Sequence, residues 1–238
     1  AQIAADAVRG QEGKRIRRFD HTMMRAIQRR QRLIADMKKA LRDEGFTFFL
    51  QPKYNSVTGK IISMEALARW EHSEFGSISP SEFVPLMEKS GLVTWLDRFV
   101  WEGVCRVLRE WQMDGRRVVP ISVNVSRQDF EIIDVPESFN RLVKRYDIDP
   151  RLLRVEITET IFAENMDQIN RAVEQLHQYG FTVLMDDFGS GYSSLNMLKD
   201  LSVDVLKLDK GFMEDAASNE KGQRIIASIV RLAQSLGM

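Results

Sequence analysis

Short apolar runs alternate with longer amphipathic segments from about residue 46 to the end of the chain. The short runs have the length and composition of strands, and the longer segments repeat apolar residues every three or four positions, as helices do. Strands are predicted at 46–51, which Pro52 is expected to end, and at 61–69, 119–125, 153–158, 182–185 and 203–208. Helices are predicted at about 81–89, 94–114, 138–146, 165–179, 193–200 and 220–236.

This alternation predicts an α/β fold with a mostly parallel sheet and helical crossovers. A (β/α)₈ barrel typically needs about 250 residues and eight strands, whereas six strands are predicted here in roughly 190 residues. The pattern alone is therefore compatible with two architectures, an open sheet or a barrel that stops two units early.

A further amphipathic helix is predicted upstream of the first strand. Asp20 is a suitable N-cap and Gly45 a suitable stop. Two interpretations remain open, a helix packed on the main domain or a helix that connects it to an upstream domain. The apolar positions that define this helix are Met23, Ile27, Ile34, Met37 and Leu41.

The overall charge gives no sign of a nucleic-acid or membrane partner, and neither is predicted. The 238 residues include 34 basic and 34 acidic side chains. The first 45 residues hold 12 basic and 6 acidic ones, which leaves 22 and 28 in the remainder. This mildly acidic body suits a protein that binds metal ions.

Cys105 is the only cysteine, and its neighbours have helical apolar spacing. It is therefore predicted to be a buried thiol rather than a nucleophile. The sequence shows no signal peptide and no apolar run that is long enough to span a bilayer. These features predict a cytoplasmic location.

Two adjacent carboxylates, Asp186 and Asp187, end the predicted strand 182–185, and a glycine-rich turn follows them. Two like charges at the end of a buried strand repel each other and are costly to desolvate unless a cation compensates them. Similar polar residues lie in or just after the other strands, and the carboxyl ends of barrel strands build the active site. These residues are Glu65, Asn124, Glu156, Glu159, Lys207 and Asp209.

Carboxylates and an amide oxygen, without a His or Cys cluster, favour Mg²⁺ or Mn²⁺. Asp186 and Asp187 are suited to hold two ions, and two ions can stabilise both the attacking and the leaving oxygen in phosphodiester hydrolysis. Arg69 lies four residues after Glu65, on the same face of a strand, where it can bind a phosphate. Lys207 can orient or polarise the attacking water.

At this point the residues resemble a known family, the EAL domain, which is a bacterial phosphodiesterase that opens cyclic di-GMP to linear pGpG. The resemblance runs from about Gly45 to the last residue, and its segments follow the family order. They are Gln51-Pro52, Glu65-Ala66-Leu67, Pro80–Leu86, Val123–Ser126, Glu156–Glu159, Asp186–Leu195 and Leu206–Asp209.

The resemblance implies a role for each matched residue. Glu65, Asn124, Glu156 and Asp186 are implied as ligands of a first metal ion, and Asp186 and Asp187 as ligands of a second. Lys207 is implied to lie near the catalytic water, and Gln51 and Arg69 to contact cyclic di-GMP. Glu159 is implied to anchor the loop 188–194. In the family this loop also shapes the dimer interface, so the resemblance implies a homodimer through that region.

The resemblance also implies a TIM-like barrel whose first strand is antiparallel to the others. The family continues past the segment matched by 232–238 into a seventh strand with a metal-binding Glu and an eighth unit. The chain is therefore expected to be an incomplete barrel with about six of eight strands, truncated before the last two units and inactive or impaired. The expected domains are 1–44, the tail of an upstream GGDEF-type domain with its connecting helix, and 45–238, the EAL-like domain.

Two other functions remain open. The first is a receptor that binds cyclic di-GMP without cleaving it, although such a receptor need not keep every ligand residue. The second is an unrelated metal-dependent enzyme with a TIM barrel, which would not bind cyclic di-GMP.

Overall fold

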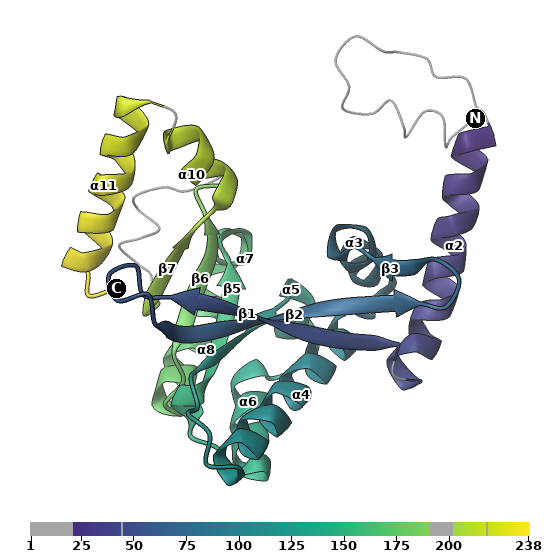
Figure 1. Cartoon of the computed structure of the whole chain (residues 1–238), viewed down its shortest axis with the longest axis horizontal. Coiled ribbons are helices and arrows are strands. Elements are labelled where there is room, and N and C mark those ends of the chain that lie inside the picture. Colours follow the sequence, from purple (N-terminus) through teal and green to yellow (C-terminus); the bar gives the residue numbers. More distant parts are fainter. Residues whose placement is uncertain (1–20, 44, 191–201, 218) are drawn as a thin grey trace.

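The computed structural model describes residues 21–43, 45–190, 202–217 and 219–238, and the predicted helix 193–200 lies outside them. One mixed sheet forms the centre, with helices around it (Figure 1). The strands are β1 (Phe46–Tyr54), β2 (Ile61–His72), β3 (Gly76–Ile78), β4 (Ile121–Val125), β5 (Leu153–Thr158), β6 (Val183–Phe188) and β7 (Val205–Leu208). The helices are α2 (His21–Arg42), α3 (Pro80–Ser90), α4 (Val93–Met113), α5 (Arg127–Ile132), α6 (Val135–Tyr146), α7 (Glu159–Glu164), α8 (Met166–Gln178), α10 (Lys210–Ala217) and α11 (Glu220–Ser235), with a 3₁₀ turn at Pro150–Leu152.

The sheet has the strand order β1-β2-β4-β5-β6-β7, and β3 pairs with β2 off this path. β1 is antiparallel to β2, whereas β2, β4, β5, β6 and β7 are parallel along the sheet. This arrangement confirms the mostly parallel α/β sheet and the antiparallel first strand. Figure 1 shows β1 and β2 as one long ribbon, with α10 and α11 near one end and α2 at the other.

The main core lies between the parallel strands and the helices that cover them. Four of the five residues of β4 are buried, as expected for a strand covered on both faces. Cys105 is fully buried among apolar residues of α4, as predicted. Burial raises the pKa of its thiol to about 12, which leaves it unreactive at neutral pH.

A second core fixes α2 to the far end of the ribbon. Leu33 and Met37 of α2 are fully buried in the same cluster as Trp70 of β2 and Phe83 of α3. The Nε2 atom of His72 lies 3.2 Å from Asp36 Oδ2. These contacts show that α2 packs on the domain, while a connection to an upstream GGDEF-type domain stays a prediction.

Several predicted bounds were wrong. β1 continues through Pro52, which pairs with Met64, because β1 is the first strand of the described sheet and the missing N–H can face away from β2. β2 reaches His72 and β6 reaches Phe188, so both strands are longer than predicted. The short elements β3, α5, α7 and α10 were not predicted. No helix among the described residues is long and apolar enough to cross a bilayer.

Candidate metal and substrate site

Three carboxylates from three strands meet at the carboxyl edge of the sheet. They come from Glu65 on β2, Glu156 on β5 and Asp186 on β6, and one oxygen of each lies within 4.8 Å of the others. The strand register brings them together, since Asn124 pairs with Glu156 and Thr158 pairs with Asp186. Glu156 is fully buried, with a side chain that is 0% exposed. This arrangement needs compensating positive charge.

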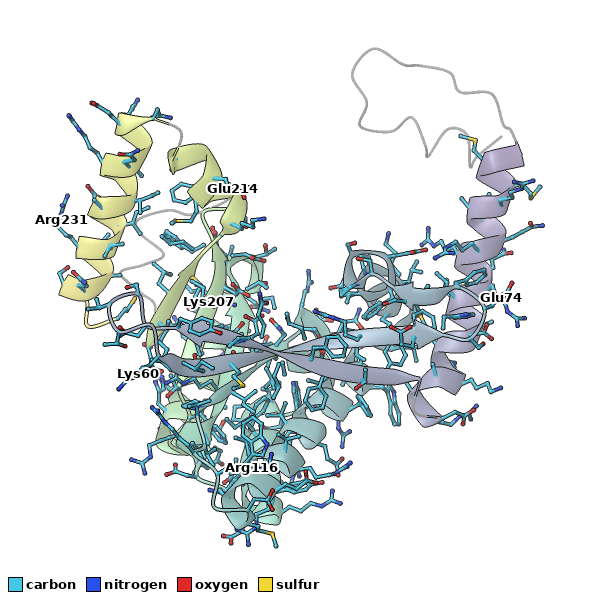
Figure 2. All side chains as sticks on the ribbon, in the orientation of Figure 1. Lys60, Glu74, Arg116, Lys207, Glu214 and Arg231 are labelled. Atoms are coloured by element: carbon cyan, nitrogen blue, oxygen red, sulfur yellow. The ribbon has the colours of Figure 1, made fainter. Side chains whose placement is uncertain are left out.

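Lys207 of β7 supplies one of the compensating charges. Its Nζ atom lies 3.1 Å from Glu65 Oε2, 2.5 Å from Glu156 Oε2 and 2.7 Å from Asp186 Oδ2. Figure 2 shows Lys207 where β7 approaches the β1–β2 ribbon. The ammonium therefore lies at the common focus of the three carboxylates, which is the position that a bound cation needs.

Lys53 of β1 supplies a second charge that the sequence analysis missed. Its Nζ atom lies 2.6 Å from Glu156 Oε1, 3.1 Å from Glu65 Oε2 and 3.3 Å from Ser122 Oγ. The two lysines hold opposite oxygens of Glu156. One signal was available, because Lys53 is two residues from Gln51 and Gln51 pairs with Glu65, so all three belong to one face of the ribbon.

The protonation of the cluster follows from these contacts. Burial raises the pKa of Glu65, but the charges of Lys207 and Lys53 outweigh burial and hold this pKa below its usual value. Burial likewise lowers the pKa of Lys207, and the neighbouring Glu156, Asp186 and Glu65 more than reverse this and raise it. Glu65 is therefore ionised and Lys207 protonated at neutral pH.

The predicted residues Asn124, Arg69 and Gln51 lie around the cluster. The backbone oxygen of Asn124 accepts a 2.9 Å hydrogen bond from Trp101 Nε1, which ties β4 to α4 beside Glu156. The Nη1 atom of Arg69 donates to Ala68 O at 2.8 Å, and the guanidinium lies over the ring of Phe49. Gln51 pairs with Glu65 but is itself exposed.

Asp187 lies outside the carboxylate triad. Its backbone has a φ of 58°, in the left-handed region, and its N–H donates to Asp186 Oδ1 at 2.9 Å. Burial, followed by the charges of Asp186 and Asp209, raises the pKa of Asp187. The structure thus joins Asp186, but not Asp187, to Glu65 and Glu156.

Glu159 holds the turn that follows Asp187. It is the first residue of α7, it is buried, and its Oε2 accepts a 2.9 Å hydrogen bond from the N–H of Gly189. This contact agrees with the expected anchoring role at the start of the loop 188–194. Residues 191–194 of that loop lie outside the described residues, so the homodimer through it stays a prediction.

A cavity of about 520 Å³ lies beside the triad, between β2, α3, α4 and the ends of β4 and β5. Its lining is mainly apolar and includes Leu67, Val84 and Leu96. Arg69 and Asn124 also line it, which connects the cavity to the carboxylate site. A mostly apolar cavity with a few polar groups is typical of a small-molecule site.

Asp97 lines the same cavity, and this partly buried acid lies near the fully buried Asp129; the sequence analysis also missed this pair. Asp129 Oδ2 accepts hydrogen bonds from the N–H and the hydroxyl of Ser126 at 2.7 and 2.8 Å, whereas Asp97 Oδ2 and Asp129 Oδ1 are buried without a hydrogen-bond partner among the described residues. Burial and then the charge of Asp129 raise the pKa of Asp97 well above its usual value. The protonated form of Asp97 is therefore favoured in the folded protein.

The chain belongs to the EAL domain family, because the family model matches residues 34–238, which is most of the sequence. The match begins within α2. It agrees with the order of the site residues along the chain and with the sheet that holds them. The family assignment made from the sequence is confirmed.

The chain is similar to two curated proteins of Pseudomonas aeruginosa. It is 34% identical over 220 residues to the bifunctional diguanylate cyclase/cyclic di-GMP phosphodiesterase MucR, covering 92% of this chain and 32% of that protein. It is 35% identical over 223 residues to the cyclic di-GMP phosphodiesterase PA2567, covering 92% of this chain and 38% of that protein. The chain thus spans about a third of the length of these relatives.

The fold matches a solved structure described as the PaMucR phosphodiesterase in complex with c-di-GMP. The TM-score is 0.81 at 35% sequence identity, and the match covers 87% of this chain and 84% of the other. This similarity confirms the α/β, TIM-like fold class for the described strands.

Proposed function

We propose that this domain hydrolyses cyclic di-GMP to linear pGpG with Mg²⁺ or Mn²⁺ as cofactor. The observation that carries the proposal is the convergence of Glu65, Glu156 and Asp186 on one cationic position next to the cavity. The relatives named as cyclic di-GMP phosphodiesterases support the substrate. A cytoplasmic location and an upstream GGDEF-type domain stay predictions.

The donor set fits a hard divalent cation. Opposite ligands of Mg²⁺, each at about 2.1 Å, lie roughly 4.2 Å apart. The three carboxylate oxygens are within 4.8 Å of one another, so small side-chain movements bring them into range. Asn124, which pairs with Glu156, can add an amide oxygen. When bound, the metal supplies positive charge to the phosphate oxygens and lowers the pKa of a water ligand.

The remaining residues bind and orient the substrate. Arg69 lines the cavity and offers a planar guanidinium, which suits bidentate binding of a phosphodiester. The apolar wall of the cavity suits the face of a guanine base. Gln51, next to Glu65 in the register, provides a further hydrogen-bonding group for the nucleotide.

Lys207 has two roles in this proposal. With no metal bound, it neutralises the three carboxylates. With substrate present, its ammonium would donate hydrogen bonds to the reacting phosphate and to the attacking water. Glu159 supports Asp187 indirectly, since its bond to Gly189 fixes the turn next to Asp187, the residue that would hold a second ion.

A receptor that binds cyclic di-GMP without cleaving it is the second candidate. One observation favours it, namely that Asp187 lies outside the triad, so the described residues gather the ligands of a single ion. A single ion can support binding, whereas the proposed hydrolysis uses two.

The two candidates are separated by measuring binding and turnover on the same sample. Cyclic di-GMP is incubated with the protein and Mn²⁺, and pGpG is quantified by chromatography, while binding is measured calorimetrically. Metal-dependent pGpG formation supports the hydrolase, and saturable binding without pGpG supports the receptor. Failure to bind contradicts both.

A further inference from the structure

Lys53 has contacts that distinguish it from Lys207. Its ammonium holds Glu156 Oε1 and the Ser122 hydroxyl, on the β1–β2–β4 side of the cluster. Among the contacts of the described residues, its carboxylate partners are Glu65 and Glu156 but not Asp186. Lys207 instead touches all three carboxylates. A metal ion at the common focus must therefore displace Lys207, whereas Lys53 can keep its bond to the outer oxygen of Glu156.

The charge balance gives Lys53 a measurable role. Three carboxylates and two ammonium groups leave the cluster with one net negative charge. Without Lys53, Glu156 Oε1 loses a 2.6 Å charged hydrogen bond inside the protein, where the Glu156 side chain is 0% exposed. Leaving a buried charge without its partner strongly destabilises a fold. The metal-free protein therefore depends on Lys53.

The same charge acts against a divalent ion. A cation at the focus of the triad is attracted by the carboxylates and repelled by Lys53, and the repulsion scales with the product of the two charges. Lys53 also orients Glu156, which favours metal binding, but Glu156 is already packed within β5 and needs little help to keep its direction. The repulsion therefore outweighs the orientation.

We infer that Lys53 is an internal counter-ion that stabilises the metal-free carboxylate cluster and lowers its affinity for divalent cations. This makes Lys53 a positioning residue that sets how easily the metal exchanges. The inference rests on the proposed function, because it assumes that the triad binds a metal ion.

The test compares Lys53→Met, Lys53→Gln and Lys53→Arg with Lys60→Met in the full 238-residue chain. Lys60 is an exposed lysine just before β2 in the same hairpin and serves as the matched control (Figure 2). Mn²⁺ affinity is measured by electron paramagnetic resonance of the free ion, and melting temperatures are measured in EDTA and in saturating Mn²⁺.

We expect Lys53→Met to melt roughly 5–10 °C lower than the control in EDTA, with Mn²⁺ recovering most of the difference. We expect it to bind Mn²⁺ about tenfold more tightly, which is about 1.4 kcal/mol. Lys53→Gln, which keeps a donor but no charge, should also bind Mn²⁺ more tightly and remain easier to fold. Lys53→Arg, which keeps the charge, should have a Mn²⁺ affinity and a melting temperature close to those of the control.

Unchanged or weaker Mn²⁺ binding by both neutral variants overturns the inference. A Lys53→Gln variant with the same Mn²⁺ affinity as the unmodified protein also overturns the inference, because the hydrogen bond and not the charge would then set that affinity. If the unmodified chain binds no Mn²⁺, the proposed metal site itself is wrong. That outcome is distinct from a site that binds Mn²⁺ with an affinity that does not depend on Lys53.

Discussion

The backbone N–H of Gly189 donates to Oε2 of Glu159 at 2.9 Å, which joins the end of β6 to the start of α7. The two residues are 30 positions apart in the chain. This bond places the turn after Asp186 and Asp187 on a buried carboxylate. The geometry of the proposed metal site thus depends on a residue that does not touch the triad.

Gly189→Ala should destabilise the protein by about 2–3 kcal/mol, measured by urea unfolding. Gly189 has a φ of 99°, and a Cβ atom there would lie 2.8 Å from Phe212 Cγ. Gly59→Ala is the matched control, because Gly59 has a φ of 65° but no neighbour within 4 Å of a Cβ. It should cost about 1 kcal/mol, from backbone strain alone. An equal loss of unfolding free energy in the two variants would show that the Phe212 side chain moves aside at no cost.

Glu65→Gln should reduce metal-dependent turnover by more than the roughly 10–100-fold that loss of a supporting hydrogen bond costs at a metal site. The substitution keeps the shape of the side chain but removes one of the three charges at the focus. Glu174→Gln, on the exposed face of α8, is the control and should retain activity. The assay is pGpG formation in Mn²⁺ and after EDTA. Full activity of Glu65→Gln would exclude the assigned ligand role.

The substitution Asp97→Asn should stabilise the folded protein, relative to the unmodified protein, more strongly as the pH rises. The folded pKa of Asp97 is raised above the unfolded value of about 3.9, so the folded state binds the extra proton. Stability from this group is therefore lost as the pH rises from about 4 through the folded pKa. Asparagine stays uncharged at every pH, and thus avoids this loss.

The measurement is the melting temperature of the Asp97→Asn variant relative to the unmodified protein at pH 5 and pH 8. The difference should be larger at pH 8. Asp43→Asn, at an exposed site after α2, should show no such trend. A constant difference for Asp97→Asn would mean that the pKa of Asp97 is not raised in the folded protein.

Leu33→Ala should weaken the domain by about 2–5 kcal/mol, because Leu33 is fully buried between α2 and the ribbon. Arg29→Met should cost less than about 1 kcal/mol, since its 2.8 Å ion pair with Glu82 is partly exposed at both ends. Chemical unfolding of both variants tests whether apolar packing or the ion pair holds α2. A larger loss for Arg29→Met would reverse that conclusion.

Periodicity was sufficient for the long elements and failed for the short ones. The bounds of β5 were predicted to the residue, because apolar and polar residues alternate through Leu153–Thr158 between a proline turn and a helix. β3 has three residues and α7 has six, which is too few for a period to appear. Glu159 was accordingly predicted only as a residue just after a strand, and the helix that it begins was not predicted.

Site residues were predictable where a polar residue interrupts a buried strand, as Glu65, Glu156 and Asp186 do. Lys53 was not, because a lone lysine in a strand usually faces solvent, and its partner Glu156 is 103 positions away. The pair of Asp97 and Asp129 was hidden for a similar reason, since each acid has an ordinary place in an amphipathic helix. Such contacts depend on tertiary packing.

The two lysines of the cluster also differ in when they become available. Lys53 precedes Glu65, Glu156 and Asp186 in the chain, whereas Lys207 follows all three and reaches back across 142 positions to Glu65. On the ribosome, the acidic residues therefore emerge before Lys207 exists, and domains begin to fold during synthesis. Lys53 is already present to neutralise Glu65 and Glu156, so the nascent sheet can bury these acids before its last described strand is made.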